Sequence, residues 1–123
     1  MKRSMMQVFV KGSKEALELY RKGFDTEVLC TYPDDNGGYM HTELNAYGQE
    51  IAISEINQNV IPGNTMMFCF HFGEGGESKV KKAYAMLKDG AAVNNPPEAC
   101  DYSPCQCVLT DKFGVTWCLF ENV

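Results

Sequence analysis

The fold is indicated most clearly by the stretch DKFGVTWCLFE, residues 111–121, because an earlier part of the chain is organised in the same way. In each half a strand-like run precedes a helical segment, and further strands then end in a hairpin that turns at a glycine. The separation between the copies grows from 61 residues at the opening strand (Phe9 to Phe70) to 66 at the hairpin (Gly48 to Gly114), as small loop insertions would produce. The chain is therefore predicted to be an α+β protein of two βαβββ modules, at about residues 1–56 and 64–123.

Length and composition favour one folded domain that spans residues 1–123. A chain of 123 residues buries roughly two thirds of its unfolded surface. Its content of 45% hydrophobic residues is typical of a globular protein. The formal net charge of −5 is spread along the chain, which argues against a nucleic-acid partner, because nucleic acids bind basic surfaces. The charge suits a cationic or neutral ligand.

The first ten residues contain two basic side chains and only a short apolar run, which Gln7 interrupts. Such a run is too short for a signal peptide and far too short to cross a bilayer. We therefore predict a cytoplasmic protein without a membrane partner.

The chain has six cysteines, and an even number in a short chain can indicate disulfides. Because the expected core is large enough without them, reduced thiols are predicted, several of them packed in strands as small apolar residues. Cys100, Cys105 and Cys107 lack the paired C-x-x-C spacing of a structural zinc site. They are predicted to be buried or surface thiols rather than metal ligands.

Two helices are predicted from apolar residues at helical spacing. The first has Ser13 as its N-cap, runs to about Lys22 and ends at Gly23. The second covers about residues 77–88 and carries an apolar stripe, which consists of Val80, Ala83, Tyr84 and Leu87. This stripe and that of the first helix, which consists of Ala16, Leu19 and Tyr20 with Phe24 just beyond, are expected to face the core.

Strands are predicted where β-branched and aromatic residues lie between turn signals. They cover about residues 5–10, 26–32, 38–45, 49–55, 65–72, 91–94, 105–110 and 115–121. Residues 34–38, DDNGG, are predicted to form a hairpin loop, and residues 57–64 a linker between the modules. Residues 94–104 hold three of the five prolines and are predicted to form a loop that covers a cavity mouth.

Two βαβββ modules that end in an Asp-x-Phe-Gly-Val-x-Trp strand resemble the vicinal oxygen chelate superfamily, and most closely its PhnB-like branch. The resemblance covers nearly the whole chain. It rests on the run EALELY (residues 15–20), on YMHTEL (39–44), on Gly90-Ala91, and above all on residues 111–117. It implies two curled mixed sheets around a cleft, helices on the outer faces, and a homodimer.

Members of this superfamily that catalyse reactions bind a divalent metal through the first and fourth strands of each module. By register, the resemblance places those positions at Met5 and Ala52 in the first module and at about Met66 and Cys118 in the second. A shift of two residues keeps the same face and would bring in Gln7 or Glu50. These residues are poor ligands for a hard cation, so no metal, no other cofactor and no catalytic residue is predicted.

Side chains alternate along a strand, so His41 and Glu43 lie on the same side of the third expected strand. They orient a ligand in the cleft, act there as a base and its partner, or are solvated polar residues on an exposed face. His71 is expected to be structural. The predicted ligand cleft consists of Gln7, His41, Glu43, Met66, Phe68, Cys118 and Phe120.

Three functions remain open from the sequence. The favoured one is a metal-independent protein that binds a small molecule, whose identity the residues do not give. The second is a metal-dependent lyase or thiol transferase of glyoxalase type with an unusual ligand set, drawn from His41, Glu43 and Gln7 or Glu50. The third is a protein-interaction module without a small-molecule ligand.

Overall fold

A computed structural model describes residues 1–122 and divides the chain into two compact units. The first unit is Met1–Ile61, and the second begins at Pro62. No helix in the described part of the chain is long and apolar enough to span a membrane. Each unit is described by itself below.

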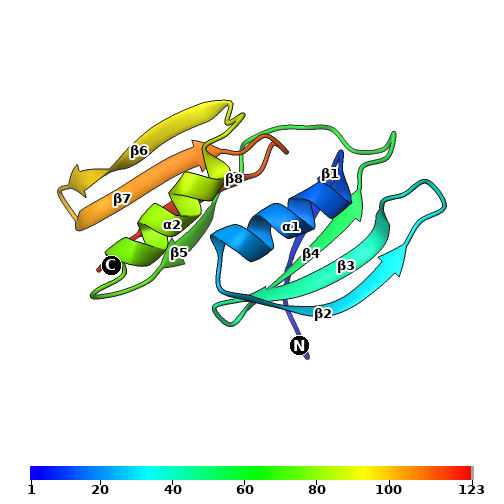
Figure 1. The fold of residues 1–123 in the computed structure, drawn as a ribbon, viewed down its shortest axis with the longest axis horizontal. Helices are drawn as coiled ribbons and strands as arrows, with labels where there is room; N and C mark the ends of the chain where they lie inside the picture. The colour runs from blue at the N-terminus through cyan, green and yellow to red at the C-terminus, as the bar shows by residue number, and fades with distance from the viewer. Residues whose placement is uncertain (123) are drawn as a thin grey trace. The chain divides into compact units, whose positions relative to one another are not determined.

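The first unit is a four-stranded mixed sheet with one helix (Figure 1). The strands lie in the order β1-β4-β3-β2, with β1 parallel to β4 and the other pairs antiparallel. We call it the first sheet. Its elements are β1 (Met6–Val10), α1 (Ser13–Gly23), β2 (Thr26–Pro33), β3 (Tyr39–Ala46) and β4 (Gln49–Glu55).

The second unit repeats this topology (Figure 1). Its strand order is β5-β8-β7-β6, and β5 is parallel to β8. We call it the second sheet. Its elements are β5 (Phe68–His71), α2 (Glu77–Leu87), β6 (Val93–Cys100), β7 (Ser103–Thr110) and β8 (Thr116–Phe120). The predicted α+β class and the two βαβββ modules are confirmed.

Each helix packs its apolar stripe against the sheet of its own unit. In α1 the buried side chains include Ala16, Leu17 and Tyr20; in α2 they are Val80, Ala83 and Leu87. In the first sheet the large aliphatic strand residues that are fully buried share one parity, which places their side chains on the α1 side. They are Val10, Leu44, Ile51 and Ile53. The opposite face carries Ala52, which is also fully buried, together with polar residues.

The start of α1 differs from the prediction, because Ser13 is not its N-cap. Gly12 holds that position with φ 93°, a left-handed conformation that glycine adopts without a steric penalty. Glu55, at the end of β4, supplies the missing acceptor. It accepts hydrogen bonds from the backbone N–H of Gly12 (3.0 Å) and from the N–H (2.9 Å) and hydroxyl (2.7 Å) of Ser13. The cap is thus tertiary, and the spacing within the helix did not indicate it.

The second unit caps its helix with the same device. Glu121 follows β8 as Glu55 ends β4, and its Oε2 accepts a hydrogen bond of 2.9 Å from the N–H of Glu77, the first residue of α2. A carboxylate at a helix N-terminus also interacts favourably with the helix dipole. The internal repeat therefore includes a stabilising contact as well as the strand order.

Residues 94–104 are mostly strand, which contradicts the predicted loop. They form most of β6 and the start of β7, joined by a tight turn. β6 lies at the edge of the second sheet, and its register with β7 shifts between Asn95 and Glu98, where Pro96 and Pro97 stand. Proline is tolerated at edges and bulges, because no ladder N–H is needed there. The prolines thus mark a bulged edge strand.

The signature stretch is held together by the buried carboxylate of Asp111. Its Oδ1 accepts hydrogen bonds from the N–H of Phe113 (2.9 Å) and of Val115 (3.0 Å), and its Oδ2 accepts one from Nε1 of Trp117 (2.9 Å). The Trp117 ring is fully buried and stacks on Phe70, with 5.9 Å between ring centroids. The motif that indicated the fold therefore builds the β7–β8 hairpin.

Candidate functional site

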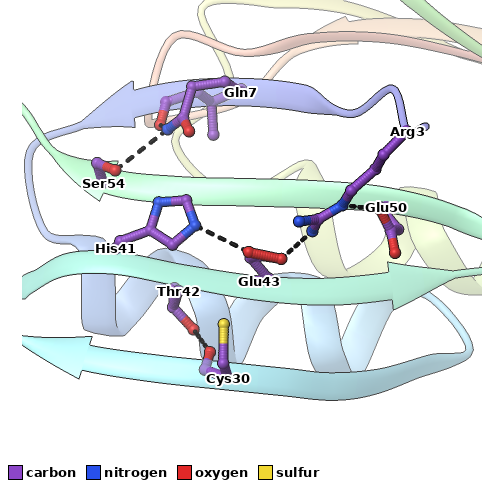
Figure 2. Close-up of polar contacts among 9 residues, drawn as sticks. Arg3, Gln7, Cys30, His41, Thr42, Glu43, Glu50 and Ser54 are labelled. Carbon is purple, nitrogen blue, oxygen red and sulfur yellow. Dashed lines mark hydrogen bonds and ion pairs between the residues drawn. The ribbon is translucent and has the colours of Figure 1, made fainter. Parts of the chain in front are cut away.

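A group of polar side chains that contact one another lies on the face of the first sheet that points away from α1 (Figure 2). Side chains alternate along β4, so Glu50, Ala52 and Ser54 lie on this face while Ile51, Ile53 and Glu55 lie on the α1 side. We call it the polar face. It consists of Arg3, Gln7, Cys30, His41, Glu43, Glu50 and Ser54.

Glu43 is the centre of the polar face, and each of its carboxylate oxygens has its own partner. Oε2 lies 3.0 Å from Nε2 of His41, and Oε1 accepts a hydrogen bond from the guanidinium of Arg3. Nε of Arg3 also donates to Oε2 of Glu50 at 2.6 Å. Hydrogen bonds from His41 and then from Arg3 hold the pKa of the Glu43 carboxyl below its usual range. Glu43 is therefore ionised and oriented at neutral pH.

Cys30 completes a compact group with His41 and Glu43. It lies directly opposite Glu43 in the β2–β3 pairing. The thiol sulfur, an imidazole nitrogen and a carboxylate oxygen all lie within 4.8 Å of one another. Burial, and then the negative charge of Glu43, raise the pKa of the Cys30 thiol. Cys30 is thus protonated at neutral pH.

Gln7 lies at the other side of the polar face, on β1. Its Nε2 donates to the hydroxyl of Ser54 and to the carbonyl of Val8, each at 3.1 Å. Strand pairing places Gln7 beside Ala52, and Ala52 beside Glu43. A single row across the sheet therefore runs Gln7, Ala52, Glu43, Cys30, and three of the four side chains are polar.

The second unit places its predicted site residues differently from the expectation. Met66 precedes β5 and is 85% exposed. Phe68 pairs with Trp117, so its side chain lies on the face opposite to that of Cys118 and Phe120, which contradicts the predicted common face. The reason is a one-residue difference in register, which reverses every side chain of a strand.

His71, expected to be structural, lies on the same face as Cys118 and Phe120 and opposite to Phe68 and Phe70. It pairs with Phe120 in the β5–β8 ladder, and the two rings stack with 4.7 Å between centroids. Gln106 donates a hydrogen bond to the Cys118 sulfur at 3.4 Å. Burial raises the pKa of Cys118 to about 11, so this thiol is a poor nucleophile at neutral pH.

Arg3 and Cys30 belong to the polar face but were not predicted as site residues. Arg3 precedes β1, and local sequence patterns carry no information about its contact with Glu43, 40 residues away. The position of Cys30 opposite Glu43 could in principle have been predicted by pairing β2 and β3 residues outward from the 34–38 hairpin loop. This pairing is displaced by register shifts between Val28 and Cys30 and between Tyr32 and Pro33.

Comparison with known proteins gives information on the fold. No family model matches the sequence, and no curated protein matches it. Solved structures do match. A PhnB protein from Bacillus cereus has a TM-score of 0.78 at 22% identity, over 98% of this chain and 99% of that one. Protein PA1353 from Pseudomonas aeruginosa has a TM-score of 0.81 at 15% identity, over 99% and 98%.

A third similar structure is the fosfomycin resistance protein FosX from Listeria monocytogenes, determined in complex with Mn(II) and sulfate. Its TM-score is 0.69 at 13% identity, over 98% of this chain and 90% of that one. This chain has the vicinal oxygen chelate fold. The predicted resemblance is therefore confirmed at the level of the fold.

The metal positions that the vicinal oxygen chelate resemblance implies do not fit a metal in this chain. In the first unit Ala52 of β4 offers no ligand, and its neighbour on β1 is Gln7 rather than the predicted Met5, so a single amide oxygen is the one donor at these two positions. In the second unit the corresponding neighbours are Cys69 and Cys118. Two thiols from β5 and β8 are not the His, Glu or Gln ligands that this resemblance implies.

Proposed function

We propose that this protein binds a small molecule on the polar face of the first sheet. The observation that carries the proposal is the oriented His41–Glu43 pair, with Nε2 and Oε2 3.0 Å apart and Arg3 holding the second carboxylate oxygen. Groups already held in place lose little conformational entropy when a ligand arrives. An oriented donor and acceptor on a partly exposed face therefore favour binding of a polar small molecule.

The ligand in this proposal is cationic or neutral. The carboxylates of Glu43 and Glu50 outnumber the single guanidinium between them, and the whole chain has a formal net charge of −5. An anionic ligand would be repelled by the two carboxylates. A nucleic-acid partner is excluded from the proposal for the same reason.

Capture of the ligand in this proposal does not use a metal at the β1 and β4 positions. Gln7, Ser54, His41 and Glu43 supply hydrogen-bond donors and acceptors directly. The protein is proposed as a binding protein, and no catalytic residue is assigned to it. A homodimer and a cytoplasmic location complete the proposal; the free state of all six cysteines supports a reducing compartment.

A ligand screen followed by thermal unfolding tests this proposal. Chelator-treated protein is unfolded in the presence of a panel of basic and neutral small molecules, and stabilised samples are repeated with variants. The chain offers a matched pair, because it has two histidines, one on the polar face and one stacked on Phe120. We expect His41→Ala and Glu43→Gln to abolish ligand-induced stabilisation and His71→Ala to retain it.

Two results would refute the proposal. Stabilisation that survives both His41→Ala and Glu43→Gln would place the ligand elsewhere. A panel without any stabilising compound, together with specific capture of one protein partner, would favour the interaction-module function instead. Native mass spectrometry of the same samples gives the oligomeric state, and a monomer would refute the dimer.

A further inference from the structure

Three different metal-ligating atoms converge from two adjacent strands, in the group formed by Cys30, His41 and Glu43. Binding of a polar ligand does not require such an arrangement. The atoms lie within 4.8 Å of one another, and Nε2 of His41 and Oε2 of Glu43 are 3.0 Å apart. In a tetrahedral zinc site, with bonds of about 2.0–2.3 Å, ligand atoms are separated by roughly 3.3–3.8 Å. The present separations of these atoms therefore bracket the spacing of such a site.

The backbone supports these side chains on regular strands rather than on a loop. Cys30 and Glu43 are direct partners in the β2–β3 ladder, and His41 is two residues from Glu43 on the same face of β3. Thr42, between them, points to the other face and donates its hydroxyl to the carbonyl of Cys30 at 2.9 Å. The three ligand atoms are therefore tied to two strands that cannot move independently.

The charges of the polar face are balanced when a divalent cation is present. Without one, Glu43 and Glu50 carry two negative charges against one positive charge on Arg3, while Cys30 is a neutral thiol. A divalent cation with a Cys30 thiolate adds one net positive charge and makes the group neutral. Arg3 need not leave, because it binds Oε1 of Glu43, whereas Oε2 faces His41.

We propose that Cys30, His41 and Glu43 form a binding site for a thiophilic divalent cation of the zinc type, on strands β2 and β3. Sulfur, imidazole nitrogen and carboxylate oxygen are the three donor types that zinc takes in proteins, whereas magnesium and calcium prefer oxygen alone. Three protein ligands leave a fourth position for water or for a bound small molecule. Arg3 binds the other oxygen of the Glu43 carboxylate, and Glu50 holds Arg3 in place, so the carboxylate is oriented before the metal arrives.

Cation binding is balanced by the loss of one proton. The sulfur of Cys30 gives its proton to solvent and forms a bond to the metal. A neutral His41 binds the metal through Nε2, the nitrogen that faces Glu43, and carries its proton on Nδ1. The Glu43 carboxylate is already ionised. One proton per bound cation is therefore released, and no oxidant or reductant takes part.

Cobalt(II) is the probe for this site, because it takes zinc positions and gives a thiolate-to-metal charge-transfer band in the near ultraviolet. Reduced, chelator-treated protein is titrated with cobalt(II) and then with zinc. We expect a band that saturates at one cobalt per chain and disappears when zinc displaces it. We expect Cys30→Ser to abolish the band. We expect His41→Gln and Glu43→Gln to weaken cobalt binding by more than about tenfold, because each replaces a direct ligand, and loss of a group that only supports a ligand already costs about 10–100-fold.

Cys100→Ser is the matched control, because Cys100 is also a half-exposed strand cysteine but lies in the second unit. It is expected to keep the full band. A band that persists in Cys30→Ser, or no band at equimolar cobalt in the unaltered protein, would overturn the inference. Glu43→Gln retains the thiol, so it tests the site even if Cys30→Ser folds poorly.

The proposed metal site rests on the proposed function only because both use the polar face of the first sheet. Each proposal can be refuted without the other. Ligand stabilisation in chelator-treated protein without a cobalt band would remove the metal site and leave the binding function. A saturable cobalt band without a stabilising ligand would leave the metal site and remove the binding function.

Discussion

The two helix caps that the repeat provides allow a quantitative test of how this chain holds its helices. Glu55 accepts three hydrogen bonds at the start of α1, of 2.7–3.0 Å, from two backbone N–H groups and one hydroxyl. The same Ser13 hydroxyl accepts a hydrogen bond from the N–H of Tyr39 at 2.8 Å, so the cap also fixes the start of β3. We therefore expect Glu55→Ala to be strongly destabilising.

The magnitude follows from the number and setting of these bonds. A hydrogen bond to a charged group contributes about 1.5–3 kcal/mol, and replacement of an N-cap acceptor by alanine costs about 0.5–2 kcal/mol. The Glu55 bonds are partly buried and water replaces some of them, so we expect a loss of about 2–3 kcal/mol in the free energy of unfolding. At roughly 3–5 °C per kcal/mol for a chain of this size, the melting temperature should fall by about 6–15 °C.

The assay is urea and thermal unfolding followed by far-ultraviolet circular dichroism. Glu55→Gln keeps a carbonyl acceptor without the charge and is expected to cost about 1 kcal/mol. Glu121→Ala removes one exposed bond to α2 and is expected to cost about 0.5–1 kcal/mol. The reasoning would be refuted if Glu55→Ala cost less than Glu121→Ala, or if Glu55→Gln were as damaging as Glu55→Ala.

Three further predictions concern other groups. Burial by itself raises the pKa of Glu55, but hydrogen bonds from Ser13 and Gly12 outweigh it and keep that pKa below the ordinary value of 4.5. The contribution of ionised Glu55 to the free energy of unfolding is therefore present above pH 4.5 and is lost as the pH falls through the pKa of the folded state. Acid unfolding curves of Glu55→Gln and of the unaltered protein should converge at low pH. Asp111→Ala should cost about 3 kcal/mol or more, because it leaves three donors of the β7–β8 hairpin without their acceptor, and fluorescence of the single tryptophan during urea unfolding measures this loss. Burial raises the pKa of Cys107 to about 12 and that of Cys118 to about 11, so a thiol reagent at pH 8 should label neither in the folded protein and all six cysteines in denaturant; rapid labelling of Cys107 in native protein would contradict the buried placement.

Helices and turns, which depend on residues close together in the sequence, could largely be predicted from the sequence. The apolar stripe of α2 places Val80, Ala83 and Leu87 in the core as expected, because helical periodicity alone decides which face is apolar. The hairpin loop at 34–38 follows from its turn residues, and Asp34 accepts hydrogen bonds from Asn36 and Gly38 there. Residue types within a few positions of each other carried the information in both cases.

The candidate site was predictable only in part. His41 and Glu43 lie two residues apart on one strand, so the sequence determined that they share a face. Their link to Cys30 and Arg3, and the position of Phe68 on the opposite face from Cys118, depend on how strands pair. Pairing shifts by one residue at a bulge, and each such shift reverses the side chains.

The order of elements, the repeat and the residue types in each strand could be read from the amino-acid chain. The strand register, the Glu55 cap and the meeting of a thiol, an imidazole and a carboxylate within 4.8 Å arise only when distant segments pack together. The physical reason is that contacts between distant segments are set by the ladder of backbone hydrogen bonds and by core packing over whole strands. The conformational preferences of neighbouring residues carry no information about the strand ladder or the core packing.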